Sequence, residues 1–205
     1  MKDRKMQIDV KRTRIFIQGG EKMEKYITAP ITEEDTKDLK HGDYVYISGT
    51  IYTARDAAHK RMYNAMLEGK SVPFDVKNNI VYYLGPSPAK ENQVIGSAGP
   101  TTSSRMDKYT PLLLDHGMKG MIGKGKRSPI VIESIKKNKA VYFAAVGGAG
   151  ALLSKCIKKS EVIAYDDLGT EAIRKLEVEN LPVIVVIDTE GNNLYETEIE
   201  EYKEK

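Results

Sequence analysis

The sequence predicts an α/β fold built on a mixed, partly parallel sheet. Three observations lead to this prediction. Apolar stretches of strand length alternate with amphipathic stretches of helix length, glycine-rich turns follow several apolar stretches, and 205 residues are enough for one core. Hydrophobic residues make up 40% of the chain and charged residues 30%, which is typical of a soluble globular protein. We therefore expect one domain over residues 1–205.

The first half of the chain is rich in predicted strands. A short helix should begin after Thr32, because a hydroxyl and the acids of residues 33–35 satisfy the free amides of a helix start. The larger elements expected here are strands over 24–31, 43–52 and 79–85 and a helix over 54–68. Because strands outweigh helices in this half, we expect a mixed sheet or a small second sheet there.

The second half alternates more regularly. The expected elements are helices over 106–116, 129–138 and 149–157 and strands over 118–122, 140–146, 160–165 and 182–188. Strands separated by helices favour parallel β-α-β units with a buried sheet. The polar tail over 196–205 is expected to fray.

Charge, cysteine content and hydropathy exclude several classes of protein. Lys plus Arg total 32 against 29 acids, and a net charge of +3 is too small to indicate a nucleic-acid partner. Residues 1–11 lack the apolar centre of a signal peptide, and no later run approaches the ~20 apolar residues that span a bilayer. We expect a cytoplasmic protein without a membrane partner. The single cysteine, Cys156, excludes a metal site built from several thiolates of this chain, so we expect no metal ligands here.

Two turns have the composition of anion sites. Residues 96–105 (GSAGPTTSSR) combine amides, hydroxyls and Arg105 at a predicted helix start, although they could equally form a surface loop that caps the helix. Residues 123–127 (GKGKR) place three cations after a predicted parallel strand, where glycines let a ligand approach; the alternative is a solvated basic turn.

A third cation, Arg55, opens the predicted helix at 54–68. The positive end of the helix dipole there calls for a nearby anion, which Asp56 supplies in part. His59, four residues later, is either a ligand contact or a buried helical histidine. If the sheet brings Arg55, Arg105 and residues 124–127 to one edge, they form a pocket for a substrate with two negative charges, such as a dicarboxylate.

The glycines at 147–150 (GGAG) offer a different hypothesis. They match half of a dinucleotide-binding fingerprint, which predicts NAD(P) binding, but a tight strand-to-helix turn explains them as well.

Several long motifs together resemble one known family. They are HGDYVYISGTIYTARDAAHKRM (41–62), GSAGPTTSSRMDKYTPLLLDHG (96–117), GMIGKGKRS (120–128), YFAAVGGAGALLSKCIK (142–158) and LGTEAIRKLEVENLPVIVVIDTEGNNLY (168–195). In this order, they resemble the β subunit, or C-terminal domain, of class I iron–sulfur fumarate hydratases and the related L-tartrate dehydratases. The resemblance implies a swivelling β/β/α domain.

The resemblance also implies a function and a partner. In that family a [4Fe-4S] cluster is held by three cysteines of the α subunit, and its open iron binds the substrate as a Lewis acid. The β part binds the substrate carboxylates, in an α2β2 assembly that reversibly hydrates fumarate to (S)-malate. Tartrate dehydration is an alternative, and so is a non-catalytic anion-binding homodimer formed by this chain alone.

Four residues receive roles through the resemblance. Arg55 and Arg105 would bind carboxylates, and Lys124 would be a further substrate-binding cation. Thr101 would be the catalytic hydroxyl, next to the carbon that gains or loses the proton. The neighbouring Thr102 remains an alternative, and a threonine hydroxyl needs a partner to act as a base.

Overall fold

The structure is a computed structural model that describes residues 12–17, 20–145 and 150–197. None of the described helices is long and apolar enough to cross a membrane. The elements are β1 (Arg12–Ile17), β2 (Gly20–Ala29), α1 (Glu33–Thr36), β3 (Tyr44–Thr53), α2 (Asp56–Leu67), β4 (Ile80–Tyr82), the 3₁₀ turn η1 (Ser103–Met106), α3 (Thr110–Asp115), β5 (Gly120–Gly123), α4 (Pro129–Asn138), β6 (Val141–Ala145), α5 (Gly150–Leu153), the 3₁₀ turns η2 (Ser154–Cys156) and η3 (Asp166–Glu171) on either side of β7 (Ile157–Ala164), and β8 (Ile173–Ile187).

The strands form one mixed sheet that folds back on itself. β2 and β3 are parallel, and β3 begins a parallel series that continues through β4, β5 and β6. The long strand β8 runs antiparallel to both β3 and β6 and closes the set. β1 and β7 add antiparallel edges to β2 and β8. The predicted α/β fold with a mixed, partly parallel sheet is confirmed.

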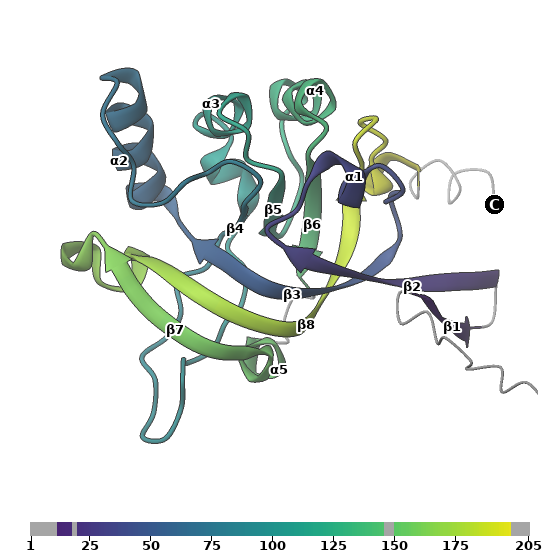
Figure 1. The fold of residues 1–205 in the computed structure, drawn as a ribbon, viewed down its shortest axis with the longest axis horizontal. Coiled ribbons are helices and arrows are strands. Elements are labelled where there is room, and N and C mark those ends of the chain that lie inside the picture. Colours follow the sequence, from purple (N-terminus) through teal and green to yellow (C-terminus); the bar gives the residue numbers. More distant parts are fainter. Residues whose placement is uncertain (1–11, 18–19, 146–149, 198–205) are drawn as a thin grey trace, which may run out of the picture.

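Alternate residues of the parallel strands face two separate cores. In β4, Ile80 and Tyr82 belong to the core shared with β3 and β8, whereas Val81 packs in the core that includes Leu113 of α3. Figure 1 shows α2, α3 and α4 on one side of these strands and β7 and β8 on the other. Strands covered on both faces are apolar throughout, and each large side chain that they bury contributes about 1.5–3 kcal/mol. This is the β/β/α layering that the resemblance implied.

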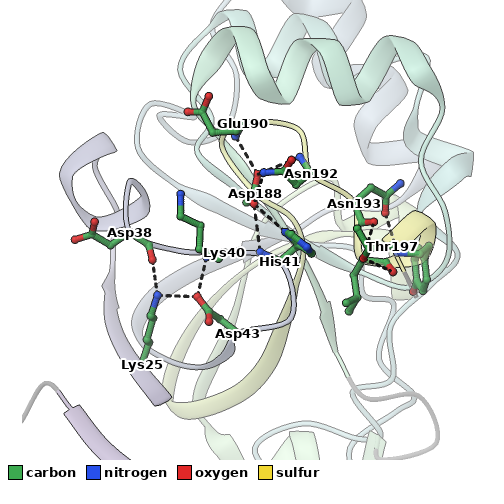
Figure 2. Close-up of polar contacts among 12 residues, drawn as sticks. Lys25, Asp38, Lys40, His41, Asp43, Asp188, Glu190, Asn192, Asn193 and Thr197 are labelled. Atoms are coloured by element: carbon green, nitrogen blue, oxygen red, sulfur yellow. Dashed lines mark hydrogen bonds and ion pairs between the residues drawn. The ribbon is translucent and has the colours of Figure 1, made fainter. Parts of the chain in front are cut away.

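Asp188 ties the end of β8 to the turn before β3 (Figure 2). Its buried carboxylate accepts the amide of His41 at 3.3 Å, and the ring Nδ1 of His41 lies 3.2 Å away. The amides of Glu190 and Asn192 donate to it from the other side, at 3.0 and 3.1 Å. Burial acts to raise the pKa of Asp188, but the hydrogen bonds from Asn192, His41 and Glu190 outweigh it and lower this pKa. The carboxylate therefore helps to keep β8 in register with β3.

Several predicted elements of the second half are wrong in extent or direction. The helix expected over 106–116 is η1 followed by α3, whose first turn accommodates Pro111. The helix expected over 149–157 is the single turn α5 followed by η2, because Ile157 already begins β7. The strand expected over 182–188 is the end of β8, and both β7 and β8 are antiparallel to their neighbours.

Candidate functional site

The candidate residues gather where the parallel strands end. Arg55 follows β3, Thr101 and Arg105 lie in the long connection after β4, and Lys124 directly follows β5. Because the carboxyl ends of parallel strands meet at one edge of a sheet, this topology places all four side chains on the same edge. The start of α2 and the 3₁₀ turn η1 lie at this edge and carry Arg55 and Arg105.

Arg55 occupies the N-cap of α2 and is held by two carboxylates. Its Nη2 lies 3.2 Å from Glu171 and 3.8 Å from Asp56. The second oxygen of Glu171 accepts the amide of Ala57 at 3.0 Å, so the same carboxylate caps the helix. The negative charge expected beside Arg55 at the start of α2 is therefore supplied by Glu171 and Asp56 of the chain itself. A Cβ at Gly85 would sit 2.6 Å from Nη1, so this glycine makes room for the guanidinium.

Arg105 is joined to Arg55 through one shared acid. Its Nε donates to Asp56 at 2.8 Å, and its side chain is half exposed on η1. An arginine that is held through Nε keeps its two terminal nitrogens available for a carboxylate. The structure thus brings the two predicted carboxylate-binding arginines together.

Thr101 and Lys124 belong to neighbouring, hydrogen-bonded segments. The amide of Thr101 donates to the carbonyl of Tyr83 at 2.8 Å, which fixes the residue at the end of β4. Thr102 pairs with Lys124 in a parallel β-bridge. Thr101 is half-buried and Thr102 is exposed, and neither hydroxyl has a hydrogen bond within the described part of the chain. Lys124 is also exposed, with no ion pair among the described residues.

A buried chain of hydrogen bonds fastens the two segments to each other. The amide of Lys124 donates to Oγ of Ser103 at 3.1 Å, and this hydroxyl lies 2.9 Å from that of Tyr142. Tyr142 in turn donates to the carbonyl of Gly125 at 2.8 Å. A Cβ at Gly123 would meet the Ser103 oxygen at 2.0 Å. Gly123, which the sequence assigned to ligand approach, is required instead by this serine.

Arg127 does not belong with the exposed cations of its turn. Its side chain is fully buried, and its Nε donates to Asp107 at 2.7 Å. The other oxygen of Asp107 accepts the amide of Ser128 at 2.6 Å, just before α4 begins. The guanidinium lies over the rings of Tyr83 and Tyr142, at 5.4 and 5.0 Å from their centres. The expectation of three anion-binding cations in this turn is therefore wrong for Arg127, which anchors the turn.

His59 lies beneath the site as a buried, neutral histidine. Its Nδ1 is 3.0 Å from the carbonyl of Arg55, and its ring packs against Tyr83 and Tyr109. Burial lowers the pKa of His59 to about 4, and nearby Arg127 acts in the same direction. Nδ1 must carry the proton to donate to the carbonyl, which leaves Nε2 as a buried acceptor without a partner in the described structure.

We expect His59 to make the isolated chain sensitive to acid. The unfolded histidine binds a proton near pH 6.5 and the folded one only near pH 4, so stability present above pH 6.5 is lost as the pH falls toward 4. The free energy of unfolding should fall by on the order of 3 kcal/mol over this pH range. Chemical denaturation across this range should show a shallower pH dependence for His59→Gln than for the wild type. Parallel curves for the two proteins would contradict the assignment.

The glycine motif at 147–150 and the single cysteine lie close to each other in sequence, and the structure describes them in part. Residues 147–149 of the glycine motif lie outside the described residues, while Gly150 packs against Gly99, so close that a Cβ would be 3.0 Å from the Gly99 amide. Cys156 ends η2 and is half-buried, and burial raises the pKa of its thiol. Among the described residues, no group of three His, Cys, Asp or Glu side chains could hold a metal ion.

The site includes residues to which the sequence gave no role. Glu171 and Asp107 each fix an arginine, and Ser103 fixes the turn of Lys124. A carboxylate that pairs with a distant arginine leaves no local pattern. The serine could have been suspected, because it lies in the hydroxyl-rich segment 96–105.

Comparison with known proteins gives a consistent set of matches. A family model described as the fumarase C-terminus matches residues 5–198. Fumarate hydratase 2 of Leishmania major is 39% identical over 156 residues, which are 75% of this chain and 28% of that protein. The anaerobic class I fumarate hydratase of Escherichia coli is 39% identical over 152 residues, 73% of this chain and 28% of that protein.

One relative differs from these in length. A Methanocaldococcus jannaschii protein carrying the name L(+)-tartrate dehydratase subunit beta is 38% identical over 177 residues, which are 83% of this chain and 91% of that protein. The matched part of the chain therefore spans 28% of the length of each of these two fumarate hydratases, but 91% of the length of the named subunit.

Proposed function

Because this chain belongs to the fumarase C-terminus family, we propose that it is the β subunit of a cytoplasmic two-subunit hydro-lyase that reversibly hydrates fumarate to (S)-malate. The observation that carries the proposal is the cationic edge after β3, β4 and β5. Arg55, Arg105, Lys124 and Lys126 outnumber the two carboxylates beside them, Asp56 and Glu171, by two charges. A dicarboxylate supplies two negative charges.

In this proposal the two arginines bind the ends of the substrate. Arg105 would use its terminal nitrogens, since Nε is engaged by Asp56. Arg55 would bind a carboxylate through the part of its guanidinium not taken by Glu171, and Lys124 would add a mobile point charge. Fixed cations also stabilise charge that develops on the substrate when a proton is removed.

The proton-transfer group is assigned to Thr101. Hydration adds a proton to one carbon of the double bond and hydroxide to the other, so one protein group must handle a proton at carbon. The half-buried Thr101 is tied to β4 through its backbone, which would hold its hydroxyl in a constant place; exposed Thr102 is the alternative. The base that activates the hydroxyl would come from the partner subunit.

The residues of this chain do not fit an iron–sulfur cluster. The sequence has one cysteine, and the described residues hold no cluster of metal-ligating side chains. We therefore propose that the [4Fe-4S] cluster is ligated by an α subunit, in an α2β2 assembly. What this chain contributes is carboxylate binding and proton transfer.

Tartrate dehydration is the second candidate. It is favoured by the relative named as a tartrate dehydratase subunit, of which 91% is matched by this chain. The test is anaerobic mixing of this chain with a cluster-bearing α chain, followed by assays with fumarate and with L-tartrate. Turnover of fumarate is expected. Turnover of tartrate alone selects the second candidate, and turnover of neither leaves the anion-binding homodimer.

A further inference from the structure

Two large apolar side chains are exposed close to the candidate site. Leu152 on α5 is 64% exposed, and Val94 in the connection after β4 is 51% exposed. Single exposed apolar residues need no explanation, but Val94 lines a surface cavity of about 380 Å³, and Leu152 lies two residues before Ser154, which also lines it. Its lining residues are Gln93, Val94, Ile95, Ser154, Lys155, Ile157 and Lys158. We call this cavity together with Leu152 the Val94–Leu152 surface.

The charge of the Val94–Leu152 surface has one sign. Lys155 and Lys158 line the cavity, and no carboxylate does. Lys158 lies 3.3 Å from Glu179 outside the cavity, while Lys155 has no ion pair within the described residues. An apolar cavity between lysines fits a partner segment that presents an apolar side chain next to a carboxylate.

The surface is continuous with the candidate site. The carbonyl of Gly150, at the start of α5, accepts the amide of Ala98 at 3.0 Å. A Cβ at Gly150 would lie 2.4 Å from Oγ of Ser97, so the two backbones are in close contact. Segment 96–99 leads within two residues to Thr101. A protein that completes the site from this side would therefore also reach α5.

We propose that the Val94–Leu152 surface is the docking surface for the cluster-bearing α subunit. The proposal rests on the proposed function and adds the place of contact. The fumarate hydratase relatives are more than three times the matched length, so a large partner must pack against this chain, as the relative named subunit beta also indicates. A second copy of this chain is a poorer occupant, because a two-fold contact would set Lys155 and Lys158 against the same cations.

The test is association of the full chain with its α subunit under anaerobic conditions. Leu152→Glu is expected to raise the dissociation constant of the complex at least ~100-fold, as for a residue at the centre of an interface. Leu67→Glu is the matched control, since Leu67 is 63% exposed and ends α2, which Figure 1 shows on the opposite side of the sheet from α5. The affinity of the Leu67→Glu variant for the α subunit should stay within about threefold of the wild-type value.

Each alternative result has a defined meaning. If the wild type binds the α subunit and Leu152→Glu binds equally well, the docking surface is wrong while the proposed function stands. If the wild type does not bind, the proposed function fails first. If Leu152→Glu only converts a dimer of this chain to a monomer, a second copy is the occupant and the proposal is overturned. Val94→Glu, in a connecting segment, provides the same test should Leu152→Glu not fold.

Discussion

Replacing Arg105 by alanine is expected to lower kcat/KM for fumarate hydration in the assembled enzyme at least ~100-fold, a loss of about 3 kcal/mol in transition-state stabilisation. Arg105 is half exposed and its only described ion pair is with Asp56, so the change removes the proposed substrate contact without opening the core. The chain should fold and bind its α subunit as before. Steady-state rates, with association measured in parallel, test this expectation.

Arg61→Ala is the matched control for Arg105. Arg61 is also an exposed arginine paired with one aspartate, Asp167, although through its two terminal nitrogens rather than Nε, and no sequence or structural feature places it in the site. Its loss should change kcat/KM by less than about threefold. Arg105→Lys should recover part of the rate, because it restores the charge but not the paired nitrogens. Equal effects of the two alanine variants would remove Arg105 from substrate binding.

Replacing Arg127 by methionine is expected to destabilise the chain by about 3–5 kcal/mol. The change leaves the Asp107 carboxylate without its partner and frees Thr110, which Arg127 also contacts at 2.8 Å. Chemical denaturation of the isolated chain measures the loss. Where the chain remains folded, the rate of the assembled enzyme should also fall, because the turn that carries Lys124 loses its anchor.

The neighbouring cation gives the control for Arg127. Lys126 is exposed, and Lys126→Met should change the free energy of unfolding by less than about 0.5 kcal/mol. The double change Asp107→Asn with Arg127→Met should recover part of the lost stability, since no unpaired charge remains. A loss below about 1 kcal/mol for Arg127→Met alone would show that the buried pair is not what holds this turn.

That the candidate residues gather at one edge could be predicted from the sequence, because the topology of the sheet determines it. Arg55, Arg105 and Lys124 each follow a predicted strand, and parallel strands end at one edge. The structure brings Arg55 and Arg105 to the same acid and pairs the Lys124 segment with Thr102. To predict this arrangement, it was enough to recognise in the sequence a strand followed by a turn that carries a cation.

The roles within the basic turn could not be predicted in the same way. Three cations in GKGKR look equivalent in sequence, and only Asp107, in a different segment, decides that Arg127 is buried. The glycines of the turn were ambiguous for the same reason, since the neighbour of Gly123 is Ser103 rather than a ligand. Side chains from separate segments set these roles.

The length of β8 was underestimated because its first half is highly charged. Over 173–181 (IRKLEVENL) the buried residues Leu176 and Val178 alternate with exposed or half-exposed charged ones, which is the pattern of a strand with one face in solvent. Pro182 then interrupts the apolar pattern, although it pairs with Tyr46 in the sheet. Antiparallel pairing with β3 on one side and β7 on the other stabilises this charged half of the strand, which local propensity alone did not predict.

The central claim is that Arg105 binds a substrate carboxylate, and a thermodynamic cycle tests it most directly. The measurement is kcat/KM of the assembled enzyme for fumarate and for a monocarboxylate analogue, with the wild type and with Arg105→Ala. If arginine and carboxylate interact, removing the carboxylate should cost the wild type at least ~30-fold more than it costs the variant, a coupling of about 2 kcal/mol. Losses that simply multiply, with no coupling, would contradict the claim.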